Sequence, residues 1–306
     1  MDVMVVGNIN LDIVYEVDRF PVEHEKLRAR NCHVSGGGSA ANTAWWLARL
    51  GQRVRICGMV GCDLFGDFAL KELSSAGIDV SLCVRADSWR TNVASIFVNS
   101  KHKTMVIGGS SFEREAERAL LAALEADAWP GVGHVHVASR SREIVAAVAA
   151  LAGKRQVTAS AEFDGIYPAD LAGLFDIVFS NEDELASAMG VADPIGILAE
   201  QFSGEKPRFF VTRGAKGVSL IEDGRITQIP ACPVEPVDRT GGGDAFDAGV
   251  LAAWLRGQDS ATAAAQGLAL ASAVIQGWGA RPEIAELEIP GLEIPGLEIK
   301  ERNRPD

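Results

Sequence analysis

The sequence shows no disulfide framework and no thiolate metal motif. Its cysteines are few, odd in number and scattered, and none forms a Cys-x-x-Cys pair: Cys32, Cys57, Cys62, Cys83 and Cys232. This spacing argues against a disulfide-stapled secreted fold and against a zinc finger. We therefore expect reduced thiols in a cytoplasmic protein.

The chain also lacks an excess of basic residues and a long apolar run. Lys and Arg number 29 against 41 Asp and Glu, which gives a net charge of −12 at pH 7. Such a balance argues against nucleic acid or an anionic membrane as the main partner. The N-terminus carries no basic region followed by an apolar stretch, so we predict neither a signal peptide nor a membrane span.

A pair of histidines is one candidate for a metal site. His134 and His136 alternate and could share one face of a strand, as metal ligands sometimes do. The sequence suggests no third ligand nearby. We therefore expect a structural role for both rings.

The 306 residues are 47% hydrophobic, enough for a large core. From residue 54 onward, apolar strands alternate with helical stretches. The predicted helices are 64–76, 113–126, 142–152, 182–189 and 194–202, followed later by 245–255 and 261–275. The predicted strands are 53–60, 133–138, 156–159, 177–180 and 208–212, then a hairpin with its turn at 222–224. This rhythm predicts a three-layer α/β/α fold around a mostly parallel sheet.

Four further stretches mix β-branched and charged residues, as short exposed strands do. They are residues 12–18, 26–34, 92–99 and 103–107, the last two separated by a polar turn at 100–102. We predict that they form a small sheet apart from the main body, a lid inserted at about 12–34 and 90–107. The tail at 286–306 repeats a five-residue unit with Pro-Gly, and we predict no chemistry there.

Polar residues gather after the first predicted strand and at a first glycine turn. Asn10 and Asp12 alternate, so they can point the same way and hydrogen-bond the hydroxyls of a polyol; an Asx turn is the alternative. Gly37 and Gly38 open a helix and let a ligand approach the backbone, and Asn42 lies one turn into that helix.

A second glycine turn opens the helix at 245–255. Gly241, Gly242 and Gly243 leave free N–H groups at a helix start, which suits an anion such as phosphate. Asp244 would be repelled by that anion unless it accepts a proton from an attacking hydroxyl. The alternative is a turn that only lets the helix pack closely on a strand.

Acidic residues also follow the strand that ends near residue 180. Asn181-Glu182-Asp183-Glu184 could cap a helix or hold Mg²⁺ through water, and spacing alone favours capping. Another glycine turn, Arg213-Gly214-Ala215-Lys216-Gly217, comes directly after Thr212.

Together these motifs resemble the ribokinase-like, or PfkB-type, family of sugar and nucleoside kinases over about residues 3–285. The most specific stretch is Asp238-Arg239-Thr240-Gly241-Gly242-Gly243-Asp244-Ala245-Phe246, close to the family's D-T-T-G-A-G-D-A-F. It departs at Arg239 and Gly242 but keeps the acid and the outer glycines. The resemblance implies an ATP-dependent kinase that phosphorylates a hydroxyl, with Mg²⁺ and, in many members, a monovalent cation such as K⁺. It also implies a homodimer formed through the lid.

The resemblance assigns roles residue by residue. Asp244 is the implied base, with the amides of Gly241, Gly242 and Gly243 as the anion hole. Asn181 and Glu184 match the family's N-x-x-E, so that Glu184 supports Mg²⁺ through water, which overrides the capping interpretation. The implied nucleotide-binding residues are Thr212, Arg213, Gly214 and Gly217, with Ala273 and Gly279 in the adenine segment 271–280. The implied acceptor-binding residues are Asn10, Asp12, Gly37, Gly38 and Asn42.

The acceptor itself stays open. Gly38-Ser39 and Ser139-Arg140 replace residues that ribokinases proper use, which counts against ribose. Arg140 would suit an anionic acceptor if it points inward, or it is exposed at a helix start. Trp89 and Phe97 could stack on a nucleobase, which keeps a nucleoside kinase as the alternative, or belong to the lid core.

Two functions from other classes fit less well. A non-catalytic sugar sensor would not need Asp244 and its glycines, yet both are intact. A dinucleotide-binding oxidoreductase needs G-x-G-x-x-G after the first core strand, and no such motif occurs there.

Overall fold

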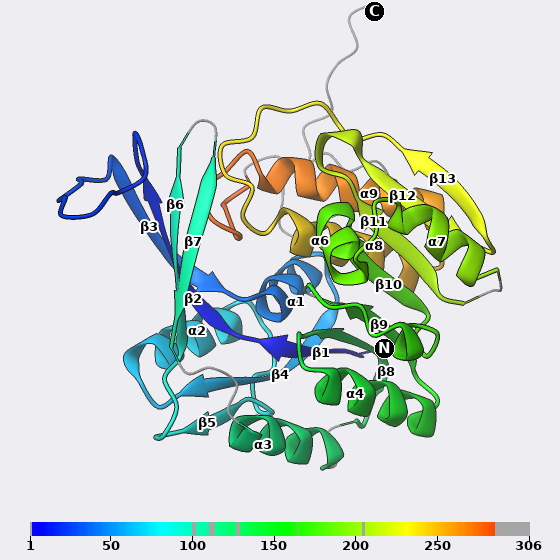
Figure 1. The fold of residues 1–306 in the computed structure, drawn as a ribbon. Helices are drawn as coiled ribbons and strands as arrows, with labels where there is room; N and C mark the ends of the chain where they lie inside the picture. The colour runs from blue at the N-terminus through cyan, green and yellow to red at the C-terminus, as the bar shows by residue number, and fades with distance from the viewer. Residues whose placement is uncertain are drawn as a thin grey trace, which may run out of the picture.

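The computed structural model of the protein describes residues 2–99, 102–109, 114–126, 129–163, 165–203 and 206–284 (Figure 1). The repetitive tail at 286–306 and most of the turn predicted at 100–102 lie outside these residues. No helix in the described ranges has both the length and the apolar character needed to cross a membrane.

The main sheet of the described chain has nine strands in the order β13-β12-β11-β10-β9-β8-β1-β4-β5. Neighbouring strands are parallel from β5 to β11, and β12 and β13 are antiparallel additions. The bounds are β1 Asp2–Asn8, β4 Arg53–Gly61, β5 Val84–Ala86, β8 Val132–Ala138, β9 Thr158–Glu162, β10 Ile177–Asn181, β11 Arg208–Thr212, β12 Val218–Glu222 and β13 Arg225–Ile229. The predicted mostly parallel sheet is confirmed.

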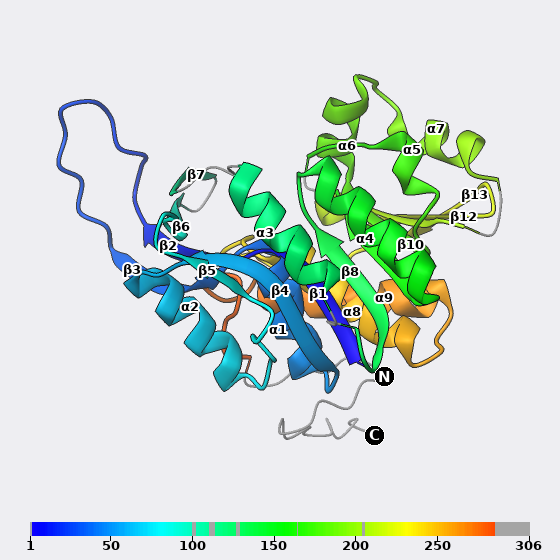
Figure 2. The ribbon, with the colours of Figure 1, turned by 90° about the horizontal axis from the view of Figure 1, so that it is seen from below.

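Helices cover both faces of this sheet (Figures 1 and 2). One layer holds α1 Ser39–Arg49, α8 Gly242–Leu255 and α9 Ser260–Val274, and α2 Leu64–Ser75 extends it toward the lid. The other holds α3 Arg114–Glu125, α4 Arg142–Arg155, α5 Ala169–Ala172, α6 Glu182–Met189 and α7 Pro194–Gln201. Along β1, Val3 and Val5 face the first core while Met4 and Val6 face the second. This alternation is what a strand buried on both faces requires.

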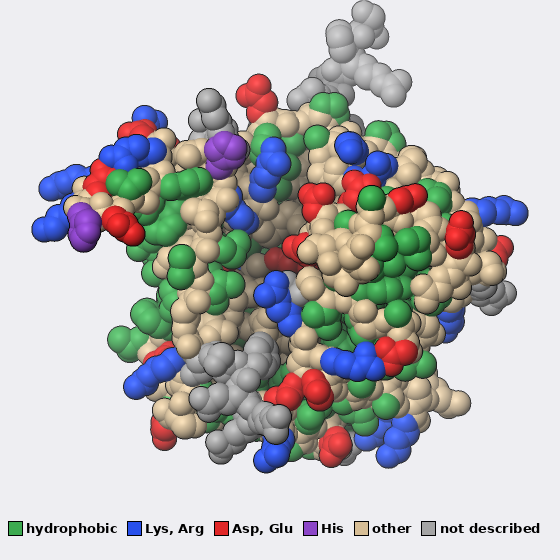
Figure 3. Space-filling view, viewed as in Figure 1, with side chains coloured by type: hydrophobic (Ala, Val, Ile, Leu, Met, Phe, Trp, Pro, Cys, Tyr) green, Lys and Arg blue, Asp and Glu red, His purple; other side chains and the backbone are tan. Residues whose placement is uncertain are grey.

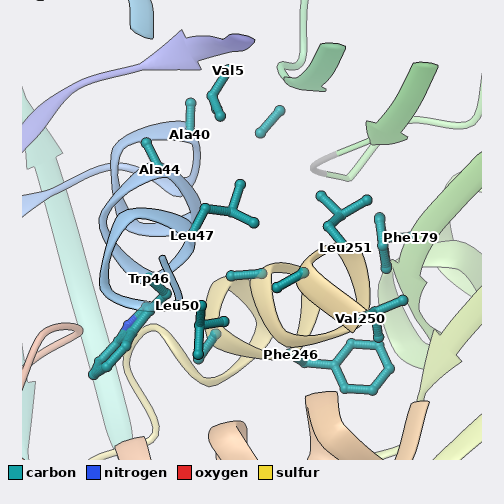
Figure 4. Packing of buried hydrophobic residues seen from close by; sticks show 14 of the residues in the cluster. Val5, Ala40, Ala44, Trp46, Leu47, Leu50, Phe179, Phe246, Val250 and Leu251 are labelled. Carbon is teal, nitrogen blue, oxygen red and sulfur yellow. The ribbon is translucent and has the colours of Figure 1, made fainter. Parts of the chain in front are cut away.

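The first core is built around the contact between α1 and α8 (Figure 4). Ala40 and Ala44 let α1 approach β1, and Leu47 lies between α1 and α8. On α8, Phe246 packs edge-on against Phe179 of β10. The alanine-rich helix α9 lies against α8, where Gly249 and Gly267 allow the two backbones to touch. This packing fixes the start of α8 relative to the start of α1.

A second, four-stranded sheet stands at the side of the body, in the order β3-β2-β6-β7 (Figure 1). Its strands are β2 Asn10–Glu16, β3 Asn31–Gly37, β6 Asn92–Val98 and β7 Lys103–Gly108. The lid strands are therefore confirmed as elements, with shifted limits: β2 begins two residues earlier than predicted, and residues 26–30 lie outside β3. Strand β2 follows β1 with only Ile9 between them, so the chain passes directly from the core into the lid.

Other limits also differ from the predicted ones. Strand β9 begins at Thr158 because Gln156 adopts a left-handed conformation that ends α4. The short elements α5 and β5 were not predicted. The start predicted at Glu113 for α3 lies outside the described residues.

Candidate functional site

The predicted acceptor residues meet where the lid joins the body. Asn10 and Asp12 lie on β2, Gly37 ends β3, and Asn42 lies in the first turns of α1. Gly37 pairs with Asn10 across the two strands. Figure 3 shows a hollow between the lid and the body, with acidic side chains inside it.

Asn42 connects this group to the predicted base. Its Nδ2 donates to Oδ2 of Asp244 over 2.7 Å, although the two residues are 202 positions apart. Nε of Arg281 donates to Oδ1 of Asn42 over 2.9 Å. Because the guanidinium is only a donor, this bond forces the amide of Asn42 to present its N–H to Asp244. The orientation of the Asp244 carboxylate is therefore set by a chain of two hydrogen bonds.

Arg281 is a site residue that the sequence reasoning missed. Its side chain is 1% exposed, lies over the ring of Trp45 with 5.3 Å to the centroid, and pairs with Glu72 at 3.3 Å. The sequence feature that could have indicated Arg281 is its position as a single charged residue directly after the largely apolar segment 271–280. Glu72 was missed because, in an amphipathic helix, an acidic residue usually faces solvent; here Oε2 accepts from the amide of Gly36.

Asp12 is almost fully buried within this charge cluster. Burial raises its pKa to about 6, and the nearby Arg281 and Lys103 oppose that rise. Its carboxylate lies directly against the backbone of Gly37, so any side chain at position 37 would collide with it. Gly37 was predicted to let a ligand approach the backbone. In the structure, the group that approaches the backbone at Gly37 is the side chain of Asp12.

Three buried polar atoms at this junction have no hydrogen-bond partner among the described residues. They are Oδ1 of Asn10, Oγ of Ser35 and Nη2 of Arg281. Buried polar groups without partners are rare in folded proteins, and a bound polar ligand is one way to satisfy them. One acceptor and one donor are among the three, and the hydroxyl of Ser35 can act as either.

The second glycine turn begins α8. Gly241 is left-handed, with φ of 74°, and its carbonyl accepts the first helical bond from Ala245 at 2.9 Å. The next two amides fall in the first turn, where helix geometry aims N–H groups along the axis. Around Gly243, a methyl group would meet nothing within 4 Å. The amide of Gly242 donates to the carbonyl of Arg239 at 3.4 Å, so Gly243 and Asp244 are the part of this turn that borders open space.

Asp238 holds this turn in place. Its Oδ1 accepts from both the amide and the hydroxyl of Thr240, at 2.9 and 2.7 Å, and its Oδ2 accepts from the amide of Gly279 at 3.0 Å. Lys103, on lid strand β7, donates to the Thr240 hydroxyl at 3.2 Å. The lid thus contacts the loop that precedes α8.

A cavity of ≈ 490 Å³ lies on the other side of the α8 start. The predicted residues Thr212, Gly214 and Gly217 line it, as do Gly242 and Gly243. Ala273 and Gly279 do not line it. Leu268, Ala271, Ser272 and Ile275 form that wall instead, because they share one face of α9, whereas Gly279 is bonded to Asp238.

Asn181 and Glu184 lie at the start of α6, near the end of β10. Oδ1 of Asn181 accepts from the amide of Glu184 at 2.8 Å, so Asn181 is the helix cap. The side chain of Arg213 bridges Glu182 and Gln228. The carboxylate of Glu184 is exposed, and carboxylate oxygen with water is the donor set that Mg²⁺ prefers. Capping by Asn181 and a hydrated Mg²⁺ at Glu184 are thus compatible.

Three residues left open by the sequence can now be placed. Arg140 is exposed after β8. Trp89 is 5% exposed, which makes it a core residue. Phe97 stacks on Tyr15 within the lid, with 5.4 Å between centroids. Neither aromatic ring is presented to the cavity beside α8.

Comparisons with known proteins agree with this architecture. Residues 1–286 match the pfkB family of carbohydrate kinases. An ATP-dependent ribose-1-phosphate kinase from Halopiger xanaduensis is 30% identical over 84% of this chain and 86% of its own. A nucleoside kinase from Methanothermobacter thermautotrophicus is 27% identical over 93% of each. Arabidopsis thaliana ribokinase, solved with ribose and ATP, superposes with a TM-score of 0.73 at 23% identity, covering 91% of this chain and 94% of that one.

Proposed function

Since the chain belongs to the pfkB family of carbohydrate kinases, a family of phosphotransferases that act on alcohol groups, we propose that it transfers the γ-phosphoryl group of ATP to a primary hydroxyl of a sugar or sugar derivative. The observation that carries this proposal is the Asn42–Asp244 bond. It ties the group of acceptor residues to a carboxylate that borders the open start of α8.

Asp244 acts as the general base in this proposal. It accepts the proton of the acceptor hydroxyl as that oxygen attacks phosphorus, and Asn42 holds the carboxylate in position. The amides of Gly241, Gly242 and Gly243, with the positive end of the α8 dipole, stabilise the charge that spreads over the phosphoryl oxygens. Asn10, Asp12 and the backbone at Gly37 and Gly38 bind the acceptor.

The nucleotide occupies the cavity beside α8. Thr212, Gly214 and Gly217 line its phosphate end, and the α9 face formed by Leu268, Ala271 and Ile275 provides an apolar surface for the base. Glu184 would hold Mg²⁺ through water, and the ion would supply charge neutralisation between phosphates. A role for K⁺ stays a prediction.

A nucleoside acceptor is the second candidate. The relative from Methanothermobacter that carries the name nucleoside kinase supports it. The burial of Trp89 removes one of the two rings predicted to stack on a base. For this reason a sugar or sugar derivative remains the first choice.

The two edge strands of the lid carry exposed apolar side chains. Val34, Met105, Val106 and Ile107 are exposed apolar residues of β3 and β7. Exposed apolar side chains often take part in protein–protein contacts, which supports the proposed homodimer. The homodimer and the cytoplasmic location stay predictions.

An ATP-consumption screen over sugars, sugar acids, sugar phosphates and nucleosides tests the proposed function. We expect turnover with one sugar class at a rate well above the ATPase rate without acceptor. Nucleosides as the best acceptors would favour the second candidate. No turnover with any hydroxyl acceptor would contradict the proposal and revive a non-catalytic sensor.

A further inference from the structure

A buried cluster lies beneath the catalytic region and has no part in the proposed mechanism. It contains His136 on β8, Glu162 at the end of β9 and Asp247 in the second turn of α8. One ligand atom from each residue lies within 4.8 Å of the other two. His136 is fully buried and Asp247 is 3% exposed. Glu162 is partly exposed. An imidazole and a carboxylate buried this deeply beside a second carboxylate demand an explanation.

The hydrogen bonds behind the cluster fix which nitrogen of His136 carries a proton. The Thr158 hydroxyl donates to the carbonyl of Gly133 at 3.1 Å, so it accepts from Nδ1 of His134 at 2.8 Å. Both rings are fully buried and their hydrogen-bond partners are neutral hydroxyl groups, an environment that disfavours a charged ring, so each ring is neutral and carries one proton. Nε2 of His134 is therefore an acceptor.

The chain continues through one hydroxyl. Ser160 donates to Nε2 of His134 at 2.9 Å, so it can only accept from Nδ1 of His136, also at 2.9 Å. The proton of His136 is thus on Nδ1, and its Nε2 carries a bare lone pair. Nε2 of His136 and Oδ2 of Asp247 have no hydrogen-bond partner among the described residues.

A neutral imidazole nitrogen and two carboxylates are all acceptors when the acids are ionised. The bare nitrogen of His136 and the unpartnered carboxylate oxygen of Asp247 lie together in a low-dielectric interior, where two acceptors repel one another unless a cation or a proton lies between them. We propose that His136, Glu162 and Asp247 bind a divalent transition-metal ion, with Zn²⁺ or Mn²⁺ as the best chemical fit.

The surroundings have the features of a metal site. One imidazole and two carboxylates suit Zn²⁺ and Mn²⁺ better than the all-oxygen environment that Mg²⁺ prefers. A metal-bound histidine usually donates a hydrogen bond from the ring nitrogen that does not bind the metal. In His136 this bond runs from Nδ1 to the hydroxyl of Ser160. Metal–ligand bonds of about 2.1 Å place ligand atoms up to about 4 Å apart, so only a small inward movement is needed.

The position gives such an ion a consequence for the enzyme. Asp247 lies three residues after Asp244 on the same helix, and residues at this spacing are neighbours on the helix surface. A bound cation would tie α8 to β8 and β9 directly below the catalytic turn. It would hold the helix start rigid without touching either substrate.

Metal content of the purified full chain tests this proposal. After treatment with a chelator, the protein is dialysed against Zn²⁺ and bound metal is measured by mass spectrometry. We expect roughly one tightly held ion per chain, and at least a tenfold loss of affinity in Glu162→Gln and Asp247→Asn. Glu184→Gln is the matched control, because it removes an exposed carboxylate of the predicted Mg²⁺ site and should retain the ion.

Anomalous scattering at the zinc edge is the second measurement, and it does not depend on how the variants fold. A peak between His136, Glu162 and Asp247 would support the proposal. A wild-type chain that binds no metal would overturn it and indicate that a proton fills the role, because burial and nearby Asp244 raise the pKa of Asp247. Equal binding by wild type and both variants, or a peak elsewhere, would also overturn it.

Discussion

The two glycine turns of this protein look alike in sequence but differ in what they make room for. At the first, before α1, the side chains of Asp12, Glu72 and Arg281 press against Gly36 and Gly37. At the second, before α8, the space around Gly243 is open. The first turn therefore accommodates the protein's own charged groups, and the second leaves room for a ligand at Gly243.

Glycines in a turn leave room beside the backbone, but the sequence does not tell whether a side chain of the protein or a ligand fills that room. The two helices that follow are in contact, and Asn42 of α1 hydrogen-bonds Asp244 of α8, so both turns border the same region. One arranges the side chains proposed to hold the acceptor, and the other presents the amides proposed to hold the phosphoryl group. Substitutions can test each half separately.

The largest effect on catalysis is expected at Asp244, which Asn42 connects to the first turn. Asp244→Asn keeps the size of the side chain but removes the base, so kcat should fall by about 10²- to 10⁴-fold. KM values for ATP and acceptor should change little. Steady-state kinetics measure this, with the exposed Asp183→Asn as control. A kcat near that of the wild type would remove Asp244 from the mechanism.

The second prediction compares the glycines directly. Gly37→Ala should displace the Asp12 carboxylate and raise the acceptor KM about 10- to 100-fold, with less effect on the ATP KM. Gly243→Ala should fold normally, because its methyl group enters open space, yet lower kcat by crowding the phosphoryl group. Unfolding in urea measures whether each variant is stable, and initial rates measure its KM values and kcat. An unchanged acceptor KM in Gly37→Ala would contradict the assignment of the first turn.

The smallest expected effect depends on pH and concerns Asp12. The pKa of Asp12 in the folded protein, about 6, lies above the value of 3.8 that an aspartate has in water. The stability that Asp12 contributes is therefore present below pH 4 and lost as the pH rises through 6. We compare the free energy of unfolding of Asp12→Asn with that of the wild type at each pH. The difference should shift in favour of the variant by up to about 3 kcal/mol as the pH rises from 4 to 7. Chemical denaturation across that range measures the gain.

The same titration affects binding. If Asp12 binds acceptor hydroxyls as a carboxylate, the acceptor KM should rise about tenfold for each pH unit below 6. In Asp12→Asn the KM should be high and independent of pH. A wild-type KM that stays constant from pH 5 to 7 would show that the ionised form is not needed.

Much of the fold could be predicted because its strands and helices have clear periodicity. Helices α6 and α7 and strand β11 agree with the prediction within one residue. The start of β9 could not be predicted, since the left-handed conformation of Gln156 is set by the packing of α4. Short α5 and β5 have too few residues to show a period.

The site was predicted unevenly for a similar reason. Motif residues such as Asn42 and Asp244 could be found, and the structure brings them into contact. Arg281, Glu72 and Asp247 could not, because their roles depend on neighbours that are distant in sequence. Asp247 was the most detectable of the three, since it is an acidic residue within an otherwise apolar helix.

The passage from β1 to β2 through Ile9 has a consequence for how new specificities could arise. Asn10, Asp12 and Ser35 belong to the lid sheet, whereas the cavity beside α8 belongs wholly to the body. In the proposed function, most acceptor-binding residues therefore belong to the lid, with Asn42 on α1 of the body, whereas the nucleotide-binding residues belong to the body. We expect that exchanging the lid strands between relatives would transplant acceptor choice while leaving the use of ATP intact.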